Sequence, residues 1–223
     1  VFINRAVGGI YTPGSIVKPF MALGALNEGI INPNTKILST GKLVLPNVYG
    51  GPDTVFKDWK AHGYVDMRHA LAVSSNVYFY EIGGGFQNQK GLGIANIGKY
   101  TKMFGLDQKT GVDIDGERAG NVPSIEWKKK YFPNDPWRVG DTYHTVIGQY
   151  GFQVTPIAMV RAIGGIASRG TLVTPHLLKD ETNPELLKIQ PLKFRNEDYQ
   201  VVHEGMRLVV TESTGHVLDL PYV

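Results

Sequence analysis

The stretch over residues 11–23 decides how this chain folds, and it reads Tyr11-Thr12-Pro13-Gly14-Ser15-Ile16-Val17-Lys18-Pro19-Phe20-Met21-Ala22-Leu23. Pro13 and Gly14 are a turn signal, and the apolar residues after them predict a helix that begins at about residue 14. Ser15 would lie in the first turn of that helix, and Lys18 would follow three residues later on the same face. We therefore expect the Lys18 amine to lie within reach of the Ser15 hydroxyl.

A serine beside a lysine is a known way to build a nucleophile. The hydroxyl needs a neighbouring base before it can attack, and a lysine amine can be that base. The first turn of a helix also directs free backbone N–H groups toward negative charge that forms at the serine. The same spacing occurs at Ser39-Thr40-Gly41-Lys42, but that stretch predicts a strand or loop, which would not hold the two side chains on one helix face. The candidate pair is therefore Ser15 and Lys18.

Composition narrows the possible classes of protein. The chain has 223 residues, 42% of them hydrophobic, which is enough for one substantial core. The net charge of +3 is mild, and we interpret the one basic run, Lys128-Lys129-Lys130, as a solvated helix face rather than a nucleic-acid patch. The absence of cysteine excludes disulfides, thiol catalysis and thiolate metal ligands.

The two ends of the chain are abrupt. No stretch approaches the roughly 18 apolar residues of a membrane span, and Val1 does not begin a signal peptide. The first residues lack a methionine and are typical of the interior of a domain. We therefore expect residues 1–223 to form one domain that is incomplete at both ends.

Hydrophobic periodicity predicts helices at about residues 14–28, 66–83, 91–104, 154–168 and 196–212. Capping and first-turn acidic residues mark the start of the last of these. The stretch 171–174 predicts a short strand. Long connections rich in glycine and proline, over 30–63 and 105–153, separate the helices, and connections of this length without regular structure usually carry function or binding.

A second motif, Ser74-Ser75-Asn76, is the only Ser-x-Asn in the chain. Alone, it is typical of a helix junction that a serine or asparagine caps. About sixty residues after a helix-borne Ser-x-x-Lys, it instead indicates a polar pair that lies against Ser15 and Lys18. Ser74 would then relay a proton with Lys18, and Asn76 would hydrogen-bond to Lys18 and to a substrate amide.

With both motifs in place, the chain resembles the penicillin-recognising serine acyltransferases, which include penicillin-binding proteins and serine β-lactamases. Nearly the whole chain is similar to class B penicillin-binding proteins, most closely to the elongation-type penicillin-binding protein 2 group. The other stretches that carry this resemblance are Asp58-Trp59-Lys60, Lys109-Thr110-Gly111-Val112-Asp113-Ile114-Asp115-Gly116-Glu117, Gly140-Asp141-Thr142-Tyr143 and Val154-Thr155-Pro156.

The resemblance implies an α+β fold, in which helices flank an antiparallel sheet and a mostly helical lobe adjoins it. It implies a peptidoglycan D,D-transpeptidase without a cofactor, which cross-links stem peptides that end in D-Ala-D-Ala. Ser15 would form the acyl-enzyme, β-lactams would acylate the same serine, and Lys18 would take its proton with Ser74 and Asn76 beside it. The pKa of Lys18 would have to fall from about 10.4 to 7, a shift of roughly 4–5 kcal/mol that burial and a nearby cation can supply.

The resemblance also implies a location and partners. The parent protein would be anchored at the extracytoplasmic face of the bacterial cytoplasmic membrane by a segment outside this chain. It would work with a membrane glycosyltransferase and elongation-complex proteins, and not with nucleic acid. The alternatives are a penicillin sensor or non-catalytic interaction module, and a serine β-lactamase. A β-lactamase would need a water-positioning glutamate, and the candidate stretch Asn183-Pro184-Glu185-Leu186-Leu187 lacks the expected asparagine four residues after Glu185.

Three departures from the family pattern matter. Lys109-Thr110-Gly111 has the letters of the family's third motif, but it comes only 33 residues after Asn76, and the true motif is expected shortly beyond Val223. Some relatives bind a metal through a cysteine at the middle of the second motif, where this chain has Ser75, so we expect no such metal. The family's usual Gly-Gln-Gly is here the four-residue stretch 148–151, Gly-Gln-Tyr-Gly.

Two weaker candidates remain. The acidic stretch over residues 113–117 hints at a calcium loop, but its glycine comes too early for an EF-hand, which favours a solvated turn. The six histidines show no metal-ligand spacing, and we interpret them as surface or packed side chains. His62 and His144 lie in the long connections, where they could line a cleft.

Overall fold

The computed structural model describes residues 3–179 and 189–220. Its elements follow one another as α1 (Arg5–Gly8), η1 (Gly14–Val17), α2 (Lys18–Asn27), β1 (Ile37–Ser39), β2 (Lys42–Leu45), β3 (Thr54–Lys57), β4 (Gly63–Val65), α3 (Met67–Ala72), α4 (Asn76–Gly84), α5 (Gly93–Met103), α6 (Ile125–Tyr131), α7 (Val139–Val146), α8 (Pro156–Ala167), β5 (Thr171–Val173), β6 (Ile189–Pro191), α9 (Asn196–Glu212) and η2 (His216–Leu218).

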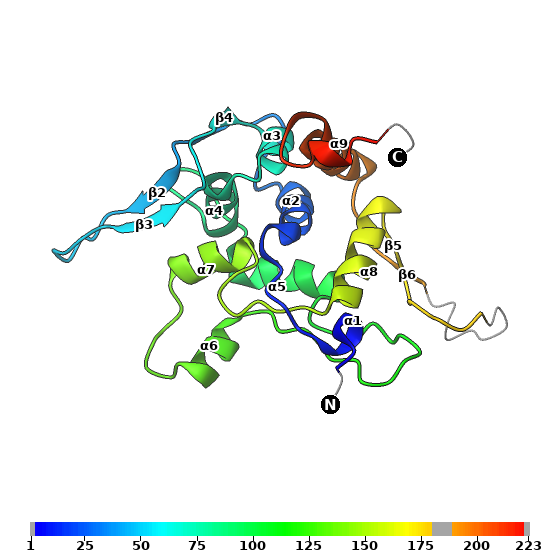
Figure 1. Ribbon diagram of the computed structural model, residues 1–223. Coiled ribbons are helices and arrows are strands. Elements are labelled where there is room, and N and C mark those ends of the chain that lie inside the picture. The colour runs from blue at the N-terminus through cyan, green and yellow to red at the C-terminus, as the bar shows by residue number, and fades with distance from the viewer. Residues whose placement is uncertain (1–2, 180–188, 221–223) are drawn as a thin grey trace.

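Helix α2 is the centre of the core. Residues 18–26 are all buried, and α3, α4, α5 and α9 pack around them (Figure 1). Gly24 lets α5 approach closely, because a Cβ at this position would lie 2.7 Å from the Tyr100 ring. A helix that is buried on every side explains why the stretch after Gly14 is almost uniformly apolar. The predicted helix over 14–28 is confirmed, except that its first turn is the 3₁₀ helix η1.

The other helix predictions mostly hold, with one difference at the second motif. Helices α5, α8 and α9 lie within one or two residues of the predicted ranges. The predicted helix over 66–83 is instead two helices, α3 and α4, because Ser74 adopts a left-handed φ of 53° that interrupts the helix. Asp66 caps α3 and Ser75 caps α4, each through a hydrogen bond from a backbone N–H three residues later.

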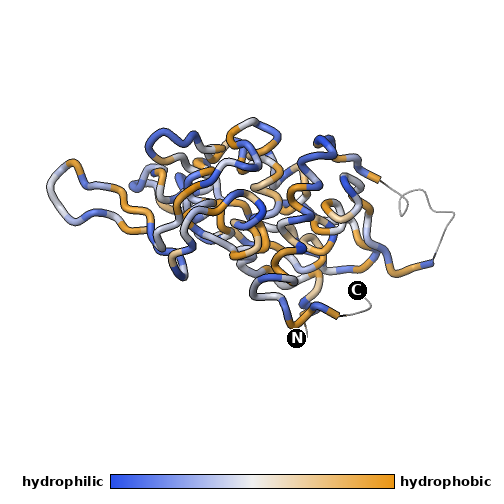
Figure 2. The backbone as a smooth tube through the Cα atoms, turned by 90° about the horizontal axis from the view of Figure 1, so that it is seen from above, coloured by the Kyte–Doolittle hydropathy of each residue, from blue (hydrophilic) through white to orange (hydrophobic). Residues whose placement is uncertain are grey.

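The expectation that residues 30–63 form a long connection without regular structure is wrong, whereas the strand or loop predicted at residues 39–42 is confirmed, since β1 ends at Ser39 and β2 begins at Lys42. The alternating stretch Lys42–Leu45 pairs with Thr54–Lys57 as an antiparallel hairpin, and β1 pairs with β4. Figures 1 and 2 show the β2–β3 hairpin extending away from the body of the molecule, with apolar segments along it. Gly41 makes the turn between β1 and β2 with a φ of +89°, a conformation that glycine adopts without strain.

The expectation for residues 105–153 is also wrong, because this stretch contains α6 and α7. The basic run on α6 is not wholly a solvated face: Lys128 is buried, and its amine pairs with Asp141 at 2.6 Å and with Asp135 at 2.9 Å. The two carboxylates offset the loss of hydration of the buried ammonium group. Lys129 and Lys130 are exposed, as predicted.

The mixed helix and strand class is confirmed. The described strands form three two-stranded antiparallel sheets, the third of which pairs β5 with β6 and packs beside α8. The predicted strand over 171–174 is β5. Within the two described ranges, every helix is too short or too polar to cross a membrane.

Candidate active site

Ser15 lies at the start of the central helix, on the surface of a pocket. Gly14 precedes it with a φ of +59°, and the Gly14 N–H donates to the Gly148 carbonyl at 3.0 Å. The serine side chain is exposed and lines a pocket of about 390 Å³ together with Lys18 and Ser74. The structure therefore brings three of the four predicted site residues to one pocket.

The Lys18 amine is buried and fully hydrogen-bonded. It donates to the Ser74 carbonyl at 2.7 Å, to the Ser74 hydroxyl at 3.0 Å and to Asn76 Oδ1 at 2.8 Å. The side chain is only 2% exposed, and the amine also faces the Phe79 ring at 5.4 Å. Asn76 thus belongs to the site through Lys18, as the sequence predicts.

Burial lowers the pKa of Lys18 to about 7, because the ammonium form loses its hydration, while the negative charge of Asp58 acts in the opposite direction. A large fraction of the amine is then neutral near pH 7, and a neutral amine can accept a proton. Burial of the amine is enough to lower the pKa of Lys18 this far, without the second cation that was expected to contribute.

The expected contact between Lys18 and Ser15 is not a hydrogen bond in this structure. All three donors of the ammonium group point to Ser74 and Asn76, and among the described residues the Ser15 hydroxyl has no hydrogen-bond partner. The amine is surrounded by acceptors, and as an ammonium group it must release a proton before it has a lone pair to offer to Ser15. Hydrogen bonds in a free site are often long or absent and form only with substrate.

One wall of the pocket comes from the C-terminal part of the chain. Helix α9 packs against α3, with Gly205 placed so that a Cβ would lie 2.8 Å from a Leu71 methyl. The pocket residues from this wall are apolar or uncharged, and they are Met206, Val209, Val210, Thr214, Gly215 and Leu218. Lys18 is therefore the one charged side chain among the described residues that line the pocket.

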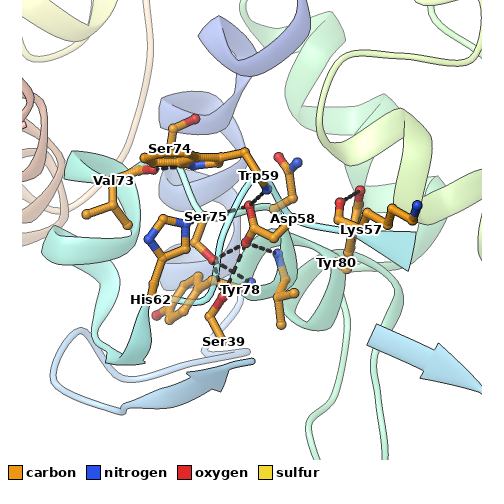
Figure 3. Close-up of polar contacts among 12 residues, drawn as sticks. Ser39, Lys57, Asp58, Trp59, His62, Val73, Ser74, Ser75, Tyr78 and Tyr80 are labelled. Carbon is orange, nitrogen blue, oxygen red and sulfur yellow. Dashed lines mark hydrogen bonds and ion pairs between the residues drawn. The ribbon is translucent and has the colours of Figure 1, made fainter. Parts of the chain in front are cut away.

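A carboxylate that was noted only as part of the Asp58-Trp59-Lys60 resemblance, with no predicted role in the site, lies behind the second motif (Figure 3). The Asp58 side chain is completely buried, and its Oδ2 accepts from the Ser75 hydroxyl at 2.8 Å, the Val77 N–H at 3.0 Å and the Ser39 hydroxyl at 3.2 Å. Burial would raise the pKa of Asp58, but these donors and the Asn76 and Trp59 N–H groups hold it below its usual value. Asp58 follows strand β3, and no residue pattern in the sequence marks it as a partner of Ser75.

The two histidines in the long connections are packed rather than open to a cleft. The His62 side chain is 2% exposed, with its Nε2 at 3.7 Å from Asp58 Oδ1 and its ring edge-on to Trp59. The His144 ring lies 5.4 Å from the Phe56 ring. Burial lowers the pKa of both histidines, so both are neutral at pH 7.

The Lys109-Thr110-Gly111 stretch lies away from this pocket and is tied to its own loop. Glu117 accepts from the Thr110 N–H at 2.7 Å and from the Gly111 N–H at 3.0 Å. Asp113 likewise accepts from the N–H groups of residues 177 and 178. The acidic stretch is therefore a turn, as expected, with Asp115 and Gly116 exposed, but Asp113 and Glu117 on either side hold it in place through hydrogen bonds.

The arrangement of side chains in the described residues does not favour a metal site. Nowhere in the described ranges do three histidine, aspartate or glutamate side chains come together in a way that could hold a metal ion. At the middle of the second motif, the Ser75 hydroxyl is engaged with Asp58 and with the N–H that it caps. The glutamate that a β-lactamase would need, in the stretch 183–187, lies outside the described residues.

Comparison with known proteins finds one matching family model and several similar proteins. The family model described as "Penicillin binding protein transpeptidase domain" matches residues 1–221. The chain is similar to the peptidoglycan D,D-transpeptidase MrdA of Haemophilus influenzae, with 39% identity over 79% of this chain and 26% of the relative. It is also similar to MrdA of Acinetobacter baumannii, with 35% identity over 98% of this chain and 32% of the relative. The chain therefore spans about a third or less of these relatives.

Solved structures agree. The penicillin-binding protein PBP2 of Pseudomonas aeruginosa superposes with a TM-score of 0.84 and 30% identity, over 99% of this chain and 49% of that one. PBP2 of Helicobacter pylori in a complex with MreC gives a TM-score of 0.78 and 33% identity, over 94% and 37%. A chain of a peptidoglycan synthase complex gives a TM-score of 0.79 and 27% identity, over 98% and 36%.

Proposed function

The chain belongs to the penicillin-binding protein transpeptidase family, and on that premise we propose that it carries the nucleophile and base of a peptidoglycan D,D-transpeptidase. The observation that supports this most is the Lys18 amine, which is buried, enclosed by Ser74 and Asn76, and has its pKa lowered to about 7. A lysine kept only to stabilise the fold gains nothing from such a shift, whereas a general base does.

The proposed reaction begins at Ser15. Its oxygen attacks the carbonyl carbon of the penultimate D-Ala, and its proton passes to the neutral Lys18 amine, with the Ser74 hydroxyl as relay. The Ser15 N–H, in the first turn of the helix, is one donor to the oxyanion, and such a donor is typically worth about 3–4 kcal/mol of barrier. The terminal D-Ala leaves as an amine that takes back the proton, and an ester to Ser15 remains.

The second half of the reaction transfers the acyl group. The amine of a neighbouring stem peptide attacks the ester carbonyl, the Ser15 oxygen leaves and regains a proton, and a peptide cross-link forms. A β-lactam in place of the donor peptide would open its ring on Ser15 and leave a stable ester, because its leaving group stays attached. The third-motif lysine that would bind the substrate carboxylate is proposed to lie beyond Val223.

The proposed location and partners of the protein rest on the proteins to which it is similar. We propose that the protein acts at the extracytoplasmic face of the cytoplasmic membrane, since peptidoglycan stem peptides are found there. The MreC complex and the peptidoglycan synthase complex among the similar structures support an assembly with elongation-complex proteins and a membrane glycosyltransferase. No nucleic-acid partner is proposed.

Transfer to an amine tests the function and separates it from the two alternatives. A full-length protein that contains this chain is incubated with a donor ending in D-Ala-D-Ala and an amine acceptor, and the products are followed by mass spectrometry. We expect a cross-linked product that disappears in Ser15→Ala and persists in Ser168→Ala, a control serine at the end of α8. An acyl-enzyme that never transfers would indicate a sensor, and rapid hydrolysis of a β-lactam would indicate a β-lactamase.

A further inference from the structure

Three consecutive residues at the end of β3 hold the second motif from both sides (Figure 3). The Tyr80 hydroxyl of α4 donates to the Lys57 carbonyl at 3.2 Å, and the Trp59 indole N–H donates to the Val73 carbonyl at 3.0 Å. Between these two contacts, the Asp58 carboxylate binds Ser75 and the first turn of α4. Residues 57–59 therefore reach the chain before, within and after the second motif.

The conformation that these contacts hold is unusual. Ser74 has a left-handed φ of 53°, a region that residues other than glycine rarely adopt. This conformation leaves both the carbonyl and the hydroxyl of Ser74 within hydrogen-bond distance of the Lys18 amine. The neighbouring residue Ser75 is fixed by the fully buried Asp58, and strained backbone of this kind persists only where the surroundings determine it.

We propose that Asp58 is a positioning residue for the transpeptidase reaction: its buried negative charge holds the second motif around Lys18 and sets how readily Lys18 gives up its proton. The inference rests on the proposed function, because it assigns Lys18 as the base. Asp58 does not line the pocket and so acts through Ser75 and the start of α4.

The charged groups near Lys18 are few. Asp58 stabilises the ammonium form, and His62 would disfavour it if protonated, but burial keeps His62 neutral at pH 7. The part of α9 and η2 that borders the pocket is uncharged. Loss of the Asp58 charge should therefore move the titration of Lys18 to lower pH, because Asp58 is the one charged group among the described residues that favours the ammonium form.

Asp58→Asn tests the proposal in a full-length protein, with the rate of acylation by a fluorescent penicillin measured from pH 5 to 9. The carboxamide keeps the shape, so its oxygen can still accept from Ser75, while the amide group loses the bond from the Trp59 N–H and can donate to His62 Nε2, which has no hydrogen-bond partner among the described residues. We expect the acid limb of the profile to move down by about one pH unit, as a single charge at interior distances produces. We also expect the plateau rate to fall about tenfold.

Further variants distinguish the effect of the Asp58 charge from the effect of the hydrogen bonds that Asp58 makes. Asp198→Asn removes another buried carboxylate, one that pairs with Arg195, and should leave the acid limb in place. Ser75→Ala breaks the link but keeps the Asp58 charge, so it should lower the plateau without moving the limb. If Asp58→Asn does not fold, Asp58→Ser is a second neutral variant, and its acid limb is read in the same way.

An acid limb that stays at the wild-type position in the neutral Asp58 variants would overturn the proposal, even with a lower plateau, because a merely structural residue lowers the plateau alone. Failure of the wild-type protein to be acylated at any pH would instead overturn the proposed function. The two failures are therefore distinct.

Discussion

The pH dependence of acylation follows directly from the state of Lys18. Burial lowers its pKa from 10.5 to about 7, a shift of roughly 5 kcal/mol against the ammonium form. With this pKa, about 9% of the amine is neutral at pH 6 and about 91% at pH 8, so the rate should rise about tenfold between them. With an ordinary lysine, the neutral fraction would rise about a hundredfold over the same interval and would keep rising to pH 10.

The assay is the second-order rate constant for labelling by a fluorescent penicillin between pH 5 and 10, with circular dichroism as a check that the fold is intact. We expect a plateau above about pH 8. Lys18→Arg is the matched control: it keeps the positive charge but cannot act as a base, so labelling should fall by orders of magnitude at every pH. A rate that climbs tenfold per pH unit through pH 9 would refute the reasoning about burial.

Three further changes test the structure around the site. Lys128→Met removes the ammonium group that pairs with the largely buried Asp141 and should lower the free energy of unfolding by about 3 kcal/mol, which urea denaturation would show; an unchanged midpoint would contradict this. Gly148→Ala would place a Cβ 2.3 Å from the Gly14 carbonyl and should slow labelling at least tenfold, as a rough expectation for a shifted helix start, whereas Gly98→Ala, with open space around it, should label normally. Burial raises the pKa of Glu81 to about 7, so the folded state holds a proton that the unfolded state loses above pH 4.5, and stability falls as the pH rises from about 4.5 to 7. Glu81→Gln should therefore raise the unfolding midpoint at pH 8 but not at pH 4, and equal effects at both would count against a buried carboxylate.

The sequence was sufficient where a single local pattern controls the structure. Uniform apolarity after Gly14 predicted the buried central helix, and the spacing of Ser15, Lys18 and the second motif predicted which side chains would share a site. Helix α9 was predicted at its observed bounds because its capping and periodic residues are all local.

The rest depends on contacts between distant segments. Strands β1 and β4, of three residues each, were not recognised in the sequence, and they exist because they pair with each other across the 23 residues that separate them. The side chains that contact the chain at and beside the break at Ser74 are Asp58, Trp59 and Lys18, which no local pattern connects to it. Burial of Lys128 depends in the same way on a carboxylate in α7 that lies outside its own helix.

Covalent capture of Ser15 tests the proposed role of the chain most directly. A full-length protein that contains the chain is incubated with a β-lactam, weighed intact by mass spectrometry, and then digested and mapped. We predict one adduct per molecule, located on the peptide that contains Ser15 and stable over the time of the measurement. An adduct on any other serine, or no adduct on a protein shown to be folded, would contradict the assignment of Ser15 as the nucleophile.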